Sequence, residues 1–346
     1  MPRGERKSLN PMLIYLLRRM CFLLVTLLAF MLIIFALPRI IPGNPLALLL
    51  RDILSRMNLQ PETVREIERK LFEQYGLDKP IHVQFIDFLS RTFKGDFGIS
   101  FYFRIPVVEI IFSRIPWTLM LLIPSTLVSW IIGNLLGAVA AYKRGKVTDN
   151  FLMSIFLTLS QVPYYWLAMI LLFLFAVRYE VFPLGGTWDT SRFITPSFNL
   201  DFIIDYLWHY VLPFTSIVIS AIGGWAIGMR VMAIYELGSD YVIYSDSLGL
   251  KDRKILEYVF KNSILPQITG LALNLGSVIG GQLLTELVFN YRGMGRILYD
   301  SISKLDYPLI EGVFIILIST LLVANLIVDF IYAYLDPRVR TGYAEV

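Results

Sequence analysis

Residues 229–266 read MRVMAIYELGSDYVIYSDSLGLKDRKILEYVFKNSILP, a polar segment with both charge signs between two long apolar runs. Burying charges in a bilayer is costly, so this stretch predicts a water-exposed bridge between two membrane spans. Apolar and aromatic side chains at helical spacing lead to Leu248, and Gly249 is typical of a helix C-terminus. A second helical run extends from Asp252 to Lys261. We therefore expect a short helix that lies across the membrane face, where another protein can bind it.

The composition places the chain in a membrane. Of its 346 residues 56% are hydrophobic and only 17% are charged, which excludes an ordinary soluble domain. The net charge of +4 is small and the basic residues are dispersed, which argues against a nucleic-acid partner. The single cysteine, Cys21, cannot form an intrachain disulfide, and His82 and His209 are too far apart to build a zinc site.

Six apolar stretches reach the length of about 20 residues that crosses a bilayer. The first, Met20 to Leu37, has no small-x-small cleavage site after it, which favours an uncleaved span over a signal peptide. The other five are residues 115–142, 151–177, 206–229, 262–285 and 312–335. Prolines that can kink or end these helices are Pro124, Pro163, Pro213 and Pro266.

Residues 38–114 form a long polar excursion between the first two spans. Pro61 can occupy the first position of a helix, and apolar residues from Val64 onward repeat at helical spacing until Gly76. Positive and negative charges are evenly mixed here. We expect a small folded cap on the membrane surface.

Lysines and arginines predict the orientation of the spans. With the N-terminus inside, the inside segments carry 15 of these residues and the two short outside loops carry 5. Both termini are therefore expected inside. The predicted organisation is an N-terminus with the first span (1–37), an external subdomain (38–114), a five-helix core (115–335) containing the bridge 229–263, and a cytoplasmic tail (336–346).

Small residues predict close helix packing. Gly133 and Gly137 lie on one helix face, as do Gly276 and Gly280, and such spacing lets helices approach closely. The alternatives for the second pair are general packing and a hinge that lets the fifth span tilt. The acidic residues Glu286 and Asp329 lie near the ends of spans, which favours structural roles over proton transfer.

The bridge resembles the cytoplasmic loop of the membrane subunits of binding-protein-dependent ABC importers, in the B-type subunit of the dipeptide/oligopeptide branch. The matching residues are Asp240, Tyr241, Val242, Gly249, Leu250, Arg253, Lys254, Asn262, Leu265 and Pro266. The sequence departs from the family pattern at residues 245–248, where small and basic residues are usual. Further matches are residues 75–80 and 95–100, Glu286, Phe289, Gly293, Gly295, Asp306, Tyr307, Pro308 and residues 336–338.

This resemblance implies an all-α membrane protein with six transmembrane helices, a short cytoplasmic coupling helix between helices 4 and 5, and a small external subdomain between helices 1 and 2. It implies as partners a second homologous permease subunit, two ATPase subunits, an extracytoplasmic substrate-binding protein and membrane lipid. The chain itself is then no enzyme and binds no cofactor, because ATP and Mg²⁺ belong to the ATPase subunits. The expected location is the inner membrane of a bacterial or archaeal cell.

The same resemblance assigns site residues. Contact with the ATPase subunits is expected from Asp240, Tyr241, Val242, Ile243, Tyr244, Ser245, Leu248, Gly249 and Leu250. Helix packing or hinge motion is expected from Pro266, Gly276, Gly280 and Gly281, on the basis of the proline and the glycine spacing and not of the resemblance.

Other functions stay open at this stage. The resemblance implies a permease subunit that forms half of the translocation pathway for peptides. The alternative is an importer of the same type that carries oligosaccharides or nickel, with which other relatives of this branch are associated. A stand-alone six-span channel or secondary transporter would need polar groups at mid-membrane or inverted halves, and neither is evident. A membrane enzyme would need a catalytic cluster, which the sequence does not show.

Overall fold

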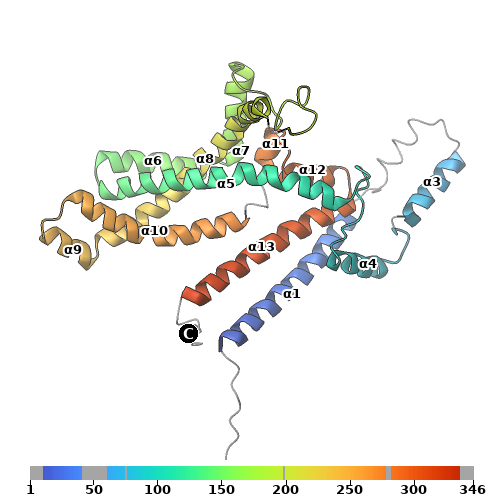
Figure 1. Ribbon diagram of the computed structural model, residues 1–346, viewed down its shortest axis with the longest axis horizontal. Coiled ribbons are helices and arrows are strands. Elements are labelled where there is room, and N and C mark those ends of the chain that lie inside the picture. Colours follow the sequence, from blue (N-terminus) through green and yellow to red (C-terminus); the bar gives the residue numbers. More distant parts are fainter. Residues whose placement is uncertain (1–10, 41–60, 75, 198, 278–281, 336–346) are drawn as a thin grey trace, which may run out of the picture. The chain divides into compact units, whose positions relative to one another are not determined.

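The computed structural model describes residues 11–40, 61–74, 76–197, 199–277 and 282–335, which are mostly helical (Figure 1). The helices are α1 (Pro11–Ile40), α3 (Pro61–Gln74), α4 (Ile81–Phe93), α5 (Val107–Tyr142), α6 (Val147–Gln161), α7 (Tyr164–Leu171), the π-helix η1 (Leu172–Arg178), α8 (Leu200–Leu237), α9 (Asp240–Ser247), α10 (Asp252–Ser277), α11 (Leu283–Val288), α12 (Met294–Ser303) and α13 (Tyr307–Leu335). The all-α expectation is confirmed for the described residues.

The chain divides into two compact units. Unit 1 comprises Met1–Arg114 and Ile297–Val346, and unit 2 comprises Ile115–Arg296. Helices α5 and α12 contribute residues to both units.

In unit 1, α1 and α13 pack side by side (Figure 1). Helix α4 packs on α1 through aromatic rings: the centroid of Phe35 lies 5.1 Å from that of Phe85 and 5.6 Å from that of Phe88. Helix α3 begins at Pro61, and Gly76 follows it with φ +65°, which confirms the helix predicted in the polar excursion. Its side chains Ile67, Leu71 and Phe72 pack against the buried residues Phe101 and Tyr307.

A buried carboxylate joins the loop before α5 to the start of α13. Asp306 accepts hydrogen bonds from the backbone N–H groups of Phe101 and Tyr102, each at 3.1 Å, and from the hydroxyl of Ser100. It also accepts from the N–H of Leu309 at 3.3 Å, so it caps α13. One fully buried side chain therefore holds a loop and a membrane helix together.

In unit 2, glycines let α8 approach two neighbouring helices. A Cβ atom added to Gly137 of α5 would lie 2.3 Å from the carbonyl oxygen of Ala226, and one added to Gly133 would lie 2.6 Å from Cβ of Trp225. Gly223 is equally close to the carbonyl oxygen of Phe156 in α6, at 2.5 Å. The close approach predicted for Gly133 and Gly137 is confirmed, and α8 is their partner.

An aromatic cluster holds the loop that precedes α8. The cluster contains Trp117, Trp188, Phe202, Tyr206 and Tyr291. The Tyr291 hydroxyl donates to the carbonyl oxygen of Trp117 and lies 3.1 Å from the Tyr206 hydroxyl. The loop is also bonded through its backbone, since Gly186 N–H donates to the carbonyl oxygen of Phe289 at 2.7 Å.

Four helical segments in the described residues are long and apolar enough to cross a membrane: Arg18–Ile40, Val107–Tyr142, Leu200–Leu237 and Tyr307–Leu326. Val147–Gln161 and Tyr164–Arg178 meet the same criterion only together and are bent by 95° at Pro163. The expected span 151–177 is thus a broken helix, whereas α5, α8 and α10 continue through their prolines. The described residues give four or five spans, and the sixth, expected at 262–285, stays a prediction.

The packing of α5 on α8 can be tested with two Gly→Ala substitutions. We expect Gly137→Ala to lower the free energy of unfolding by about 1–3 kcal/mol, because its Cβ meets backbone that must shift. Gly224→Ala is the matched control, since its Cβ meets no atom within 4 Å and alanine favours a helix. Thermal and denaturant unfolding of the purified chain in detergent would compare them. Equal stability of the two variants would contradict the packing described.

Candidate functional site

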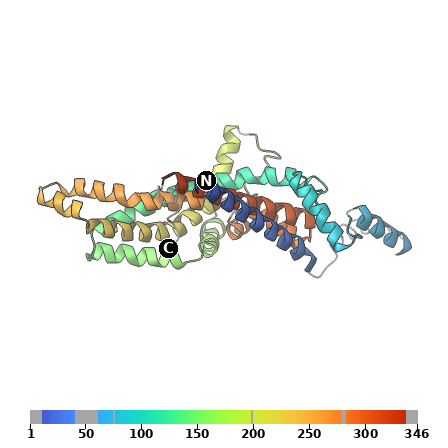
Figure 2. The same cartoon turned by 90° about the horizontal axis from the view of Figure 1, so that it is seen from below.

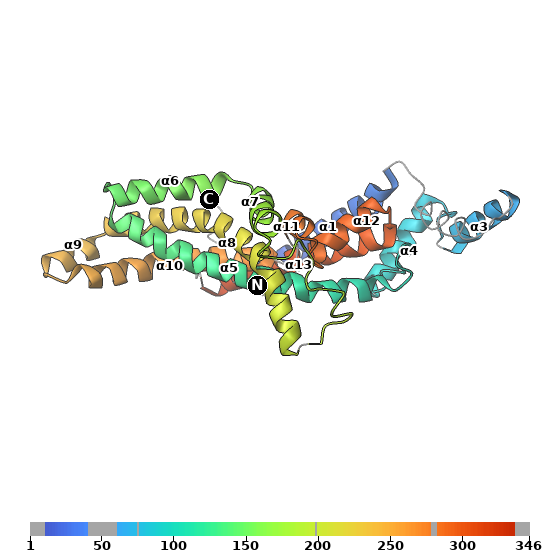
Figure 3. The same ribbon diagram turned by 90° about the horizontal axis from the view of Figure 1, so that it is seen from above.

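Helix α9 connects the C-terminal end of α8 to the N-terminal end of α10 within unit 2 (Figures 1, 2 and 3). Its C-terminus is closed by two backbone hydrogen bonds, from Gly249 N–H to the Asp246 carbonyl (2.8 Å) and from Leu250 N–H to the Ser245 carbonyl (3.2 Å). Gly249 has φ +71°, a conformation that glycine adopts at no steric cost. The helix end predicted at Gly249 is confirmed.

One face of α9 is buried against the ends of its neighbours. Val242 is 7% and Ser245 is 8% exposed. Val242 belongs to a cluster with Ala141 of α5, Ala233 of α8, and Ile255 and Val259 of α10, against which Tyr241 and Leu250 also pack. This apolar contact fixes α9 to three helices at once.

Polar bonds fix the same contact. The Tyr241 hydroxyl donates to Glu236 at 2.8 Å, and the Tyr142 hydroxyl at the end of α5 donates to Asp252 at the start of α10. Burial of the phenol and its bond to Glu236 raise the pKa of Tyr241, so this hydroxyl stays a donor at neutral pH. The first bond ties α9 to the last turn of α8, and the second ties the end of α5 to the start of α10.

The opposite face of α9 exposes large apolar side chains. Ile243 is 59%, Tyr244 is 66% and Leu248 is 62% exposed. We call these three residues the α9 patch. Tyr244 and Leu248 are four positions apart and lie one above the other on the helix surface. Large contiguous apolar patches on a surface are typical of contact with another protein or with a membrane, so these three residues are a candidate contact surface.

An ion pair joins α8 to α6. Arg230 of α8 donates to both carboxylate oxygens of Asp149 in the first turn of α6, each at 2.8 Å. Asp149 also accepts from Gly145 N–H at 3.0 Å, and its side chain is only 2% exposed. This pair is not among the contacts predicted from the sequence. An acid in the first turn of a helix was a visible signal, but its partner 81 positions away was not.

Glu286 and its glycines form a second constellation, between α11 and α12. The buried carboxylate accepts from the Thr118 hydroxyl (2.9 Å) and from the N–H groups of Gly295 (2.7 Å) and Arg296 (3.1 Å). A Cβ on Gly293 would lie 2.3 Å from this carboxylate. Glu286, Gly293 and Gly295 carry the family resemblance here, and the two glycines are required because a larger side chain would clash with the carboxylate. The structural role expected for Glu286 fits this arrangement.

The predicted hinge residues are only partly covered. Helix α10 runs through Pro266 and Gly276 and ends at Ser277. Gly280 and Gly281 lie outside the described residues, and the side chain of Asp329 is also outside what the structure describes. The hinge stays a prediction. Near Pro266, the indole N–H of Trp130 donates to the carbonyl of Gln267 at 3.0 Å, which joins α5 to α10.

Comparison with known proteins identifies the family. A sequence model of the binding-protein-dependent transport system inner membrane component matches residues 133–341. The chain belongs to this family. A second model, for the N-terminal part of these membrane components, matches residues 12–122 of the same permease chain.

Three relatives illustrate this permease family. The chain is 30% identical to the dipeptide transport system permease protein DppB of Escherichia coli K12 over 346 aligned residues, covering 95% of this chain and 99% of the relative. It is 30% identical to the glutathione transport system permease protein GsiC of Salmonella typhimurium over 330 residues, covering 95% and 99%. It is 29% identical to the oligopeptide transport system permease protein AppB of Bacillus subtilis over 329 residues, covering 94% and 99%. The resemblance noted in the sequence is confirmed.

The contribution of the Asp149–Arg230 ion pair to stability can be measured by unfolding. We expect Asp149→Asn to destabilise the purified chain by about 1–3 kcal/mol, because it leaves the Arg230 guanidinium with a weaker acceptor. Asp149→Asn/Arg230→Gln should be destabilised by less than the sum of the single variants. Asp246→Asn, on the exposed surface of α9, is the control and should stay within about 0.5 kcal/mol of wild type. Additive single effects would show that the two side chains are not coupled.

Proposed function

We propose that this chain is one of two membrane subunits of an ATP-driven importer of peptides and forms half of its translocation pathway. The support is family membership together with three relatives named as dipeptide, glutathione and oligopeptide permeases. Peptides are the substrate class that these names share. A separate binding protein outside the membrane is the partner that delivers the substrate.

The observation that carries the mechanism is the α9 patch. Ile243, Tyr244 and Leu248 are each more than half exposed although they are large and apolar, while Val242 and Ser245 face inward. In our proposal the patch inserts into a recess of an ATPase subunit. Burying such side chains in a partner would stabilise the contact by about 1.5–3 kcal/mol each.

Force on α9 reaches the membrane helices through its buried face. The cluster around Val242 joins α9 to α5, α8 and α10, and the Asp149–Arg230 pair joins α8 to α6. Closure of the ATPase subunits around ATP moves α9 and tilts the helices attached to it. ATP changes access to the pathway because it binds the two arrangements with different affinity. ATP and Mg²⁺ are bound by the ATPase subunits, and this chain breaks no bond.

The proposed topology has six spans with both termini in the cytoplasm of a bacterial or archaeal cell. It rests on the excess of lysine and arginine in the segments assigned to the inside. The α9 segment then faces the cytoplasm, where ATP is available. Residues 38–114 face the outside as a small subdomain, residues 115–335 form the core, and residues 336–346 are a cytoplasmic tail.

Charges placed in the α9 patch test the coupling. We expect Tyr244→Asp and Leu248→Asp to abolish substrate uptake and to lower co-purification of the ATPase subunits at least tenfold, because an aspartate cannot be buried in an apolar recess without a partner. Insertion should be normal, since both side chains are exposed and their loss leaves the chain's core intact. Uptake into vesicles that hold the complete transporter, and ATP hydrolysis stimulated by the binding protein, are the readouts.

The matched control is Ile194→Asp, which puts the same charge on an apolar side chain that is 88% exposed in the loop before α8. This variant should retain its ATPase subunits. Normal uptake and normal stimulated ATP hydrolysis in Tyr244→Asp and Leu248→Asp would rule out the coupling role.

A further inference from the structure

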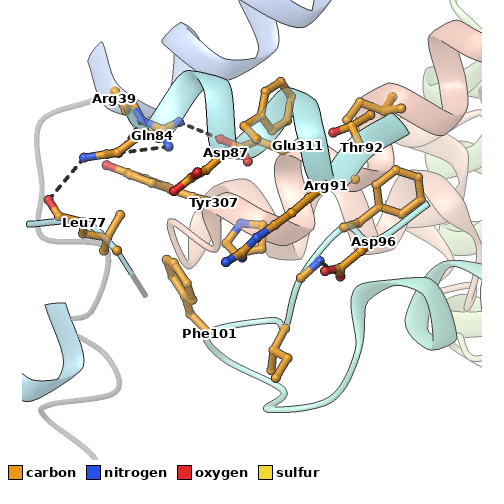
Figure 4. A pocket seen from close by; sticks show the side chains of 18 of the residues that line it. Arg39, Leu77, Gln84, Asp87, Arg91, Thr92, Asp96, Phe101, Tyr307 and Glu311 are labelled. Carbon is orange, nitrogen blue, oxygen red and sulfur yellow. Dashed lines mark hydrogen bonds and ion pairs between the residues drawn. The ribbon is translucent and has the colours of Figure 1, made fainter. Parts of the chain in front are cut away.

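Unit 1 contains a cavity of about 470 Å³ at the ends of two membrane helices (Figure 4). Arg39 lines it from the last turn of α1, and Tyr307 and Glu311 line it from the first turns of α13. The remaining wall comes from α4 and the segments that flank it. The two spans end beside this cavity, so it lies at the depth where a bilayer changes from hydrocarbon to head groups.

Most charges in the cavity wall are paired within the chain. Arg39 binds Glu311 at 2.6 Å, and Lys79 binds Asp87 at 2.9 Å. Gln84 accepts from Arg39 and donates to the backbone of Leu77 and Lys79. These bonds satisfy most of the charged and polar groups in the cavity wall, so few of them need a ligand.

Arg91 is different. Its side chain points into the cavity (Figure 4), and no hydrogen bond or ion pair within 4 Å joins its guanidinium to another residue in the described part of the chain. The nearby carboxylate of Asp96 is used instead by the backbone N–H of Gly98, at 2.9 Å. Asp87, one turn earlier on α4, also lines the cavity and attracts Arg91, but its hydrogen bond is with Lys79. A guanidinium with no bonded carboxylate in the described chain is suited to two parallel hydrogen bonds with a phosphate.

The surroundings of Arg91 favour a phosphate attached to an apolar group. Ile99, Phe101 and Tyr307 line the same cavity and give it an apolar side. On the other face of α4, Ile86 is 62% and Phe93 is 64% exposed. A helix that packs one face on a membrane span and exposes apolar side chains on the other is typical of the membrane surface.

We propose that this cavity binds the head group of an anionic phospholipid, with its phosphate on Arg91 and its glycerol backbone against Phe101 and Tyr307. The site is distinct from the α9 patch and does not depend on which substrate the transporter carries. A bound lipid there would fix α4 and the loop around Asp96 to the ends of α1 and α13.

The test compares lipid binding by two charge-removing variants of the full chain. Native mass spectrometry in detergent would give the dissociation constant of the first phosphatidylglycerol bound. We expect Arg91→Gln to weaken it about fivefold, the effect of one basic residue at a membrane surface. Lys94→Gln removes the same charge three residues away, at an exposed position outside the cavity, and should bind within about twofold of wild type.

Competition distinguishes the sources of the anion. Glycerol phosphate, inorganic phosphate and a dipeptide at millimolar concentration should not displace the lipid. Equal binding by wild type and Arg91→Gln would overturn the proposal, as would equal weakening by Lys94→Gln, which indicates a general surface attraction. Displacement by phosphate or glycerol phosphate would make this a site for free anions, and displacement by the dipeptide would make it a substrate site; either result overturns lipid binding.

Discussion

A charge that is buried inside the protein must be satisfied by other groups of the chain, and three buried carboxylates close to the ends of the membrane spans show how this chain does so. Asp149, Glu286 and Asp306 each accept backbone N–H groups at or beside the start of a helix, and each also binds a side chain from another segment. Helix N-termini have unpaired N–H groups and the positive end of the helix dipole. A carboxylate placed there satisfies these donors, and its own charge is stabilised by the dipole. These bonds lie at or beside the starts of α6, α12 and α13.

The fold near α9 was predictable because it depends on local rules. A charged bridge between apolar runs cannot enter lipid, helical spacing marks α9, and glycine marks its end. The start of α3 at Pro61 followed from the same kind of signal. The spacing of Gly133 and Gly137 predicted a close contact between two helices, although the sequence did not show that Ala226 lies opposite.

What escaped prediction depends on contacts between distant residues. Pro163 breaks its helix while α8 and α10 pass through Pro213 and Pro266, and no rule for a single proline separates these cases. The pairing of Asp149 with Arg230 is equally invisible in sequence. Within α9, the resemblance grouped Val242 and Ser245 with Tyr244 as expected contact residues, whereas the structure buries the first two and exposes the third.

The division of α9 into a buried and an exposed face supports the proposed transmission of motion from a partner to the membrane helices. A helix of eight residues is too short to be stable alone, so its position must be set by the side chains that it buries. Because these contact α5, α8 and α10 together, α9 cannot move without displacing the ends of all three or breaking the cluster. Breaking it would expose several apolar side chains to water, whereas a joint tilt retains the contacts. In the proposed coupling, motion applied at the α9 patch therefore costs less free energy when the attached helices tilt together than when the cluster breaks.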